Sequence, residues 1–433
     1  MHCFVCWTEE IIHIEIEGGV FWIFVEGTHV AINFNPLAPE EIINPYPTLA
    51  LLRAQSPVSW NEQLGGWLLT AYEDVKLAQK DKRLSAERVQ PFSDHMAATG
   101  RLALESMGKL LNDWLLFRDP PAHTPLRRLL VDTFSPRAIE NLRPRISQIA
   151  NELLVSEVGS KEVDLMSGFA FPMPALVIAH ILGVPDNDLE KFRLWSNDLA
   201  TVIGNSRMVE DRFDIGAKAL TNLTEYFRGA VDSRRSQGLR GRLIDQLIEA
   251  QDANGAMTKE ELIGTCILIL FAGHETTMHL IGNGVVLLLQ NPLELRRVQE
   301  DPGLIPPMVE EILRYESSVF AIVRVAKEEL KIQGKKIAKG DRVFLMLSAA
   351  NRDPSYFANP ETFNVSRAPN RHLSFGYGIH FCIGAQLARV EAEIAFRRLL
   401  PLLQVSELVN QELDWDDNFI LRGVKTLRIR QLC

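Results

Sequence analysis

Apolar residues recur at helical spacing through most of the chain between residues 72 and 291. In segment 138–156, Ile139, Leu142, Ile146, Ile149 and Leu153 stand three or four positions apart, so their side chains share one helix face. A second pattern of this kind starts at residue 385, directly after a cysteine, in a segment rich in strong helix formers. Helices therefore dominate the predicted fold.

Strand-like patterns are short and occupy two regions. Residues 58–60 and 67–70 flank the pair Gly65-Gly66, which indicates a hairpin turn. Residues 330–332 and 343–345 lie on either side of two further glycines and predict a small sheet. No internal repeat or low-complexity tract occurs. The predicted fold class is mainly α with a small β portion.

The longest predicted helix has its own start and stop signals. Thr258 followed by Glu261 forms a capping box, and Asn291-Pro292 ends the helix. Roughly 30 residues at about 1.5 Å each span about 45 Å, enough to cross a whole domain. The run 276–293 lacks formal charge, but it contains glycines and polar residues. We therefore predict a buried central helix and no membrane span.

Composition and charge limit the classes of function that this protein can have. The chain has 433 residues, of which 46% are hydrophobic and 23% charged, an ordinary soluble globular balance. A net charge of -9 and a pI near 5.7 argue against a nucleic-acid partner, since phosphate binding requires a concentrated basic surface. Five cysteines without a spaced framework indicate a reducing, cytoplasmic compartment. The Cys3-x-x-Cys6 pair lacks the further ligands of a zinc site.

The first 34 residues differ from the rest. They contain no Lys or Arg, and Glu9 and Glu10 stand where a secretory signal requires positive charge. The segment suits an added hairpin, or an upstream extension outside the main domain. We predict an extension of unknown role over residues 1–34 and one large domain over 35–433, because the chemistry-bearing segments lie far apart and must converge.

Residues 375–384 read F-G-Y-G-I-H-F-C-I-G, a cysteine framed by glycines just before a predicted helix. Glycines allow backbone angles and close approaches that other residues resist, so this segment can form a tight bulge beneath a planar ligand. The N–H groups and dipole of the following helix would stabilise a Cys382 thiolate as a metal ligand. For a cysteine judged alone, an inert core residue is the commoner outcome.

Residues 272–277 read A-G-H-E-T-T, in the middle of the long apolar helix. The Ala-Gly pair lacks side-chain bulk, so a flat ligand could press against the helix there. Glu275 and Thr276 place an acid and a hydroxyl beside that gap, as proton delivery requires. A structural pair between Glu275 and a nearby Arg or Lys is the alternative. We expect His274 to meet backbone or solvent and not a metal.

Two further motifs are weak by themselves. Glu311 and Arg314 stand three apart after a Pro-Pro helix start and can form a charge-assisted pair, but this spacing occurs by chance in most chains. His123 and Arg127 stand four apart and share a helix face. They form either an anion-binding pair or a solvated basic patch.

In content and in order along the chain, these segments resemble the cytochrome P450 family over roughly nine-tenths of the sequence. The resemblance implies a single triangular domain and haem b, with Cys382 as the iron ligand and Glu275 and Thr276 as the oxygen-activating pair. It also implies a structural ion pair of Glu311 and Arg314 with a third member, Arg367, or failing that Arg352. The implied haem contacts are His123, Arg127, Ala272, Arg324, Phe375, Gly376, His380, Cys382 and Gly384.

The resemblance further implies a monooxygenase of secondary metabolism that inserts one atom of O2 into a small or medium hydrophobic substrate. Electrons would come from NAD(P)H through a ferredoxin and ferredoxin reductase, since the sequence has no flavin or iron–sulfur motif. A peroxide-driven haem enzyme and a haem sensor or storage protein are the alternatives. The region 196–214 suits a lid or an ordinary surface helix pair. Pocket positions by family, each equally suited to the core, are Phe271, Val319, Phe320, Ala321, Ile322, Phe419 and Ile420.

Overall fold

The computed structural model describes residues 11–16, 19–24, 32, 34–90, 102–157, 161–204, 211–254, 257–410 and 412–432. Its helices are α1 (Pro39–Ile43), α2 (Tyr46–Gln55), α3 (Tyr72–Ala78), α5 (Leu102–Asn112), α6 (His123–Val131), α7 (Pro136–Glu157), α8 (Pro172–Leu182), α9 (Leu189–Ile203), α10 (Arg212–Gln237), α11 (Leu243–Asn254), α12 (Lys259–Gln290), α13 (Pro292–Glu300), α14 (Ile305–Tyr315), α15 (Leu347–Ala350) and α16 (Ala385–Leu403). Its strands are β1 (Ile11–Ile16), β2 (Gly19–Phe24), β3 (Val58–Asn61), β4 (Gly66–Leu69), β5 (Leu84–Ser85), β6 (Glu162–Asp164), β7 (Ile322–Ala326), β8 (Leu330–Ile332), β9 (Lys335–Ile337), β10 (Arg342–Leu345), β11 (Ser406–Leu408) and β12 (Arg428–Gln431).

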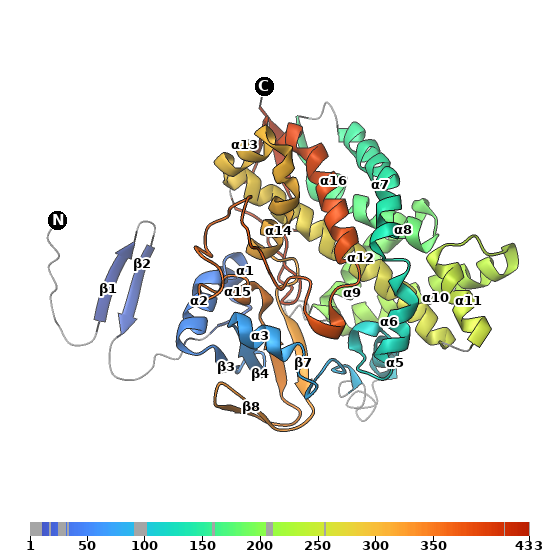
Figure 1. Cartoon of the computed structure of the whole chain (residues 1–433), viewed down its shortest axis with the longest axis horizontal. Helices are drawn as coiled ribbons and strands as arrows, with labels where there is room; N and C mark the ends of the chain where they lie inside the picture. Colours follow the sequence, from blue (N-terminus) through green and yellow to red (C-terminus); the bar gives the residue numbers. More distant parts are fainter. Residues whose placement is uncertain are drawn as a thin grey trace.

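The long helix α12 runs through the middle of the molecule, with α8, α10, α14 and α16 packed around it (Figure 1). It begins with the predicted capping box, in which Thr258 N–H donates to Glu261 Oε2 at 2.8 Å and Glu261 N–H donates to Thr258 Oγ1 at 3.1 Å. Most of its side chains are buried on all sides. The prediction of a buried central helix is confirmed.

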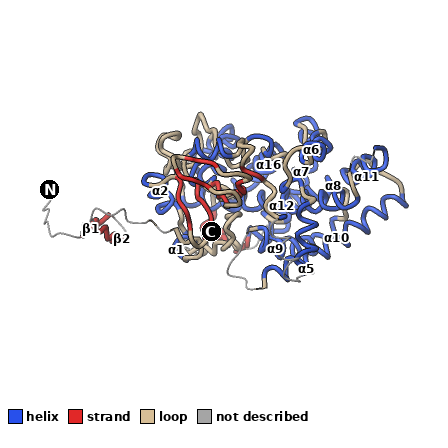
Figure 2. The backbone as a smooth tube through the Cα atoms, turned by 90° about the horizontal axis from the view of Figure 1, so that it is seen from below, coloured by secondary structure: helices blue, strands red, loops and turns tan. Residues whose placement is uncertain are grey.

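The main sheet has five strands in the order β3-β4-β10-β7-β5, and the strands gather at one end of the molecule (Figure 2). The hairpin predicted around Gly65 is β3-β4, and Gly65 has φ +58°, a turn conformation that suits glycine. The predicted small sheet of residues 330–332 and 343–345 was wrong in its pairing. Strand β8 pairs with β9, whereas β10 lies parallel to β4 and antiparallel to β7.

Two smaller β units complete the fold. Strands β11, β12 and β6 form an antiparallel sheet that joins the C-terminal end of the chain to the segment after α7. Strands β1 and β2 form the antiparallel hairpin expected for the N-terminal extension. The boundary at residue 34 stays a prediction, and the Cys3-x-x-Cys6 pair lies outside the described residues.

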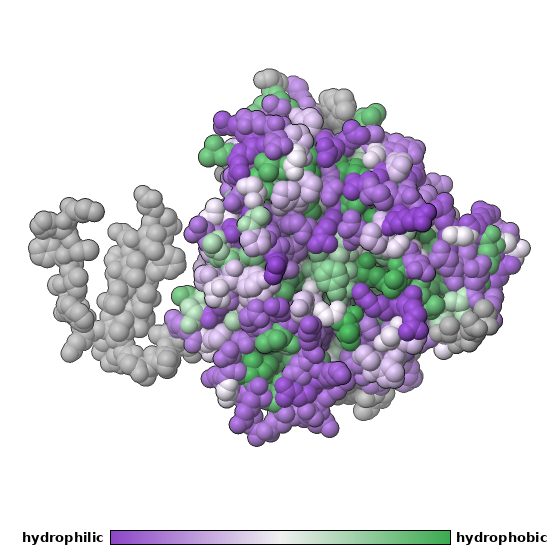
Figure 3. All heavy atoms as spheres, in the orientation of Figure 1, coloured by the Kyte–Doolittle hydropathy of each residue, from purple (hydrophilic) through white to green (hydrophobic). Residues whose placement is uncertain are grey.

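The outer surface is mainly hydrophilic in the view of Figure 3, with small scattered apolar areas. Among the described residues, no helix combines the length and apolar character needed to cross a membrane. The apolar side chains gather instead in one large core around α12 and a smaller one beside the main sheet.

Candidate functional site

The cysteine loop is a tight bulge that ends where α16 begins. Gly376 and Gly378 have φ +74° and +82°, which non-glycine residues rarely adopt, and Cys382 N–H donates to the Phe375 carbonyl at 2.8 Å. Gln79, at the end of α3, lies against both glycines. Gly384 has an ordinary φ of -85° and is the N-cap of α16, so its backbone angle does not require glycine.

The Cys382 side chain is open to an interior cavity, and protein atoms surround it on its other sides. Burial raises the pKa of the Cys382 thiol, whereas the Gly384 N–H and the charges of Arg127 and Arg389 act in the opposite direction. The thiolate therefore gains its stabilisation from the start of α16 and from two cations. A metal cation bound to the sulfur would stabilise the thiolate further.

Helix α12 forms the opposite part of the cavity lining. The side chain of Ala272 is open to the cavity, and the Thr276 hydroxyl donates to the Ala272 carbonyl at 3.0 Å. Gly273 lines the cavity as well, and its lack of a side chain has a second consequence. A Cβ at this position would lie 2.4 Å from Ile178 of α8, so its small size lets the two helices pack.

Glu275 is buried beside Thr276 and has two histidines as neighbours. Its Oε2 lies 3.4 Å from His274 Nε2, and its Oε1 lies 3.7 Å from His279 Nε2. Burial by itself would raise the pKa of Glu275, but the two histidines lower it on balance. Within the described residues, Glu275 has no Arg or Lys partner, so the predicted alternative of a structural ion pair with such a residue is not observed.

Basic side chains gather around His380. Arg88, Arg324 and His380 line the cavity, whereas His123 and Arg127 lie near His380 without lining it. The rings of His123 and His380 lie 4.5 Å apart, and Arg127 donates to the Phe381 carbonyl at 2.7 Å. Burial lowers the pKa of Arg324 to about 10. Burial and, secondarily, the charge of Arg324 lower the pKa of Arg88 to about 10 as well. All four residues that we predicted as propionate contacts are thus brought together, and Arg88 joins them.

Among the described residues, Asp119 is the carboxylate whose charge acts on His123, Arg324 and His380 of this cluster. The nearby carboxylate of Asp119 is bound by Lys327 at 2.6 Å and by Ser85 at 2.7 Å. The buried Nε2 atoms of His123 and His380 have no hydrogen-bond partner in the described part of the chain. A dianion with two carboxylates would satisfy these groups. The residues present therefore fit haem.

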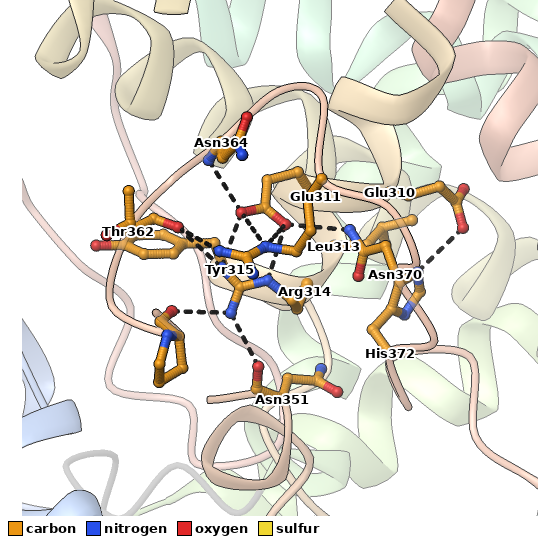
Figure 4. Close-up of polar contacts among 12 residues, drawn as sticks. Glu310, Glu311, Leu313, Arg314, Tyr315, Asn351, Thr362, Asn364, Asn370 and His372 are labelled. Atoms are coloured by element: carbon orange, nitrogen blue, oxygen red, sulfur yellow. Dashed lines mark hydrogen bonds and ion pairs between the residues drawn. The ribbon is translucent and has the colours of Figure 1, made fainter. Parts of the chain in front are cut away.

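Beneath the loop, Glu311 and Arg314 form a fully buried ion pair on α14, with Nε–Oε2 and Nη2–Oε1 distances of 2.8 Å (Figure 4). Arg367 is the third member, since its Nε lies 3.0 Å from Glu311 Oε1. Arg352, the alternative, instead lies between the rings of Tyr46 and Tyr315. Arg314 also donates to three carbonyls of the segment before the cysteine loop, which holds that segment against α14.

A second ion pair at the loop was not predicted. Arg389 of α16 binds Glu310 through Nε at 2.7 Å, and His372 Nε2 lies 3.2 Å from the same carboxylate. The Arg389 guanidinium also lies over the Phe375 ring at 4.5 Å. Glu310 stands beside Glu311 in the sequence, but no spacing rule links it to a residue 79 positions away.

The rest of the cavity lining is mostly apolar and includes the predicted Phe271, Val319, Ala321, Ile322 and Ile420. The predicted Phe320 and Phe419 do not line this cavity, because their rings pack against each other at 5.9 Å in the core. Residues that line the cavity without having been predicted include Gln79, Arg88, Phe117, Ile178, Glu391 and Leu421.

Part of the predicted lid region lies outside the described residues, since 205–210 are not described. Ile203, at the end of α9, lines the cavity. Gly204 packs tightly against Asn418, and its carbonyl accepts a 3.0 Å hydrogen bond from Phe419 N–H. The end of α9 is therefore attached to the C-terminal loop, and a lid stays a prediction.

Comparisons with known proteins agree with this site. The family model described as Cytochrome P450 matches residues 98–302 and 304–427. The polyketide biosynthesis cytochrome P450 PksS of Bacillus subtilis (strain 168) is 34% identical over 405 residues, 92% of this chain and 98% of its own length. The biotin biosynthesis cytochrome P450 of the same organism is 36% identical over 392 residues, 90% of this chain and 97% of that protein.

Solved structures lead to the same assignment. P450BioI, in complex with an acyl carrier protein ligated to hexadec-9Z-enoic acid, aligns with a TM-score of 0.84 at 36% identity and covers 91% of this chain and 100% of its own. Myxobacterial CYP267B1, in complex with myristic acid, aligns with a TM-score of 0.84 at 34% identity over 92% of this chain and 98% of its own. The chain therefore belongs to the cytochrome P450 family and is a cytochrome P450 monooxygenase.

Proposed function

We propose that this protein inserts one atom of O2 into a small or medium hydrophobic substrate, with electrons from NAD(P)H supplied through a ferredoxin and a ferredoxin reductase in the cytoplasm. One observation carries the proposal. The cavity is apolar, and Cys382 lies on one side of it, with the Glu275–Thr276 pair on α12. The sequence contains no flavin or iron–sulfur motif, so the electrons must come from partner proteins.

Each group in the site has a proposed role. Cys382 would hold the haem iron, and His123, Arg127, Arg324 and His380 would hold the propionates. Thiolate-bound haem supplies activation of O2 and oxidation of unactivated C–H bonds.

The α12 residues act on protons. The carboxylate of Glu275 can accept a proton and pass it on, and the Thr276 hydroxyl, whose own hydrogen is directed to Ala272, can accept a hydrogen bond in the cavity. The apolar lining excludes water and orients the substrate. A peroxide-driven enzyme has no need of an acid and a hydroxyl at this place.

The test is the optical spectrum of the reduced carbon monoxide complex. Cys382→Ser should abolish the thiolate-type spectrum, whereas Cys266→Ser should retain it, because Cys266 is a fully buried core residue of α12. An unchanged spectrum in Cys382→Ser rejects the ligand assignment.

Turnover separates the competing functions. A compound that shifts the ferric spectrum should then be oxidised with surrogate ferredoxin, reductase and NADPH. If binding never accelerates NADPH consumption, the sensor alternative is favoured. If peroxide alone sustains faster turnover, the peroxide-driven alternative is favoured.

A further inference from the structure

The imidazole of His274 is completely buried inside the fold, and its tautomer is determined by its surroundings. Nδ1 lies 2.6 Å from the carbonyl oxygen of Leu270, and the ring meets Phe171 edge-on at a centroid distance of 5.5 Å. A carbonyl oxygen only accepts hydrogen bonds, so Nδ1 carries the hydrogen. In a neutral ring, Nε2 is then an acceptor without a proton.

That second nitrogen faces the acid of the active site. His274 Nε2 lies 3.4 Å from Glu275 Oε2, and neither atom has a hydrogen-bond partner among the described residues. The distance leaves no room for a water molecule between them. Two buried acceptors this close repel each other unless one carries a proton. The contact is therefore stable when a proton lies between His274 and Glu275.

The other carboxylate oxygen has a second imidazole beside it. His279 Nε2 lies 3.7 Å from Glu275 Oε1. The opposite ring nitrogen, Nδ1, is buried without a hydrogen-bond partner and packs against Gly423, where an added Cβ would lie 1.8 Å away. Glu275 is thus flanked by two histidines that have no better polar neighbour at Nε2.

Other charged groups near α12 are directed elsewhere. On α8, His180 lies beside Arg242; on α16, Glu391 interacts with Thr277; and Arg422, next to Gly423, binds Glu316 at 2.6 Å. Burial raises the pKa of Glu275, and His274 and His279 are the groups that lower it.

We propose that His274 is a positioning residue of the reaction, which stores one proton as an imidazolium against the Glu275 carboxylate and passes it to that carboxylate, from which it is delivered to the cavity. This inference rests on the proposed function. The step moves one proton from Nε2 to Oε2, and a solvent proton restores the imidazolium before the next turnover. His279 holds the second carboxylate oxygen in place.

The first test observes the proton directly in the holoenzyme. The protein is labelled with ¹⁵N in its histidine rings and studied as the reduced carbon monoxide complex, which is diamagnetic. At neutral pH, both His274 nitrogens should be protonated. In Glu275→Gln the number of imidazolium rings should fall by one. A neutral His274 in the wild-type enzyme overturns the proposal, even if His274→Gln does not fold.

The second test measures how many electrons reach product. His274→Gln can still donate to Glu275 but cannot exchange a proton, so the ratio of product to NADPH should fall about tenfold, with peroxide formed instead. His180→Gln is the matched control on α8 and should couple normally. Wild-type coupling in His274→Gln contradicts the proposal. Failure of the proposed function is distinguishable, because the wild-type sample would then lack the thiolate-type carbon monoxide spectrum.

Discussion

Arg314 and Glu311 face each other through two hydrogen bonds of 2.8 Å, and neither side chain is exposed. Glu311 also accepts from Arg367, Asn370 and the backbone N–H of Asn364. Apart from the pair with Arg314 within α14, the contacts of this carboxylate therefore join α14 to the segment that leads into the cysteine loop. The pair supports the loop and does not touch the cavity.

Glu311→Gln should destabilise the protein by about 3–5 kcal/mol, because two arginines would keep a buried charge without a full partner. The expected result is a lower Tm and weaker haem retention. The Arg193–Glu190 pair on α9 has the same spacing but is exposed, so Arg193→Ala should leave the Tm nearly unchanged. If the two substitutions lowered the Tm equally, burial would not determine how much stability is lost when an ion pair is broken.

Thr276→Ala should retain haem and the carbon monoxide spectrum but divert most electrons to peroxide, since the cavity loses its hydroxyl. We expect coupling to product to fall about tenfold or more. Thr276→Ser keeps the hydroxyl and should restore most of the coupling. If the alanine variant coupled electrons to product as well as wild type, Thr276 would not be part of the proton path.

Arg324→Met should have opposite effects on the apoprotein and the holoprotein. Burial holds the pKa of Arg324 at about 10, so its charge costs free energy when no anion is bound. The variant apoprotein should melt at the same or a higher temperature than wild type. The haem-loaded variant should melt lower and lose haem faster, because a propionate partner is missing. A lower Tm in both forms would contradict the assignment of Arg324 to a propionate.

Because the carboxyl group of Glu391 on α16 is buried, we expect the stability of the folded protein to depend on pH. Both carboxyl oxygens are buried without a hydrogen-bond partner in the described part of the chain, and burial raises the pKa of Glu391 well above 4.5. In the unfolded chain it ionises near its ordinary pKa, so its contribution to stability is present in full at low pH and is lost as the pH rises.

Glu391→Gln should therefore gain stability relative to wild type between pH 5 and pH 8, and differ little at pH 4.5 or below. Thermal melts across this range measure the difference. Glu393→Gln is the control. It removes a charge from the same helix, but from a carboxylate that is paired with Arg143. A constant difference at all pH values for Glu391→Gln would mean that the carboxyl is ionised in the folded protein.

Much of the fold followed from local chemistry. The capping box of Thr258 and Glu261, the glycine turn at Gly65 and the helix after Cys382 all depend on residues within a few positions of one another. The pairing of β10 with β4 could not be read in the same way, because it joins segments more than 270 residues apart and no local pattern specifies a partner.

The sequence by itself determined the haem-thiolate motif, the acid and hydroxyl of α12 and the glycines at positive φ, because backbone and motif chemistry are local. Only the tertiary structure decided that Arg367 and not Arg352 joins Glu311, that Arg88 enters the basic cluster, and that Gly273 makes room for Ile178. It also decided that Glu275 meets two histidines and, among the described residues, no arginine. These outcomes depend on which distant side chains packing brings within about 4 Å, the range in which charge and hydrogen-bond contacts act.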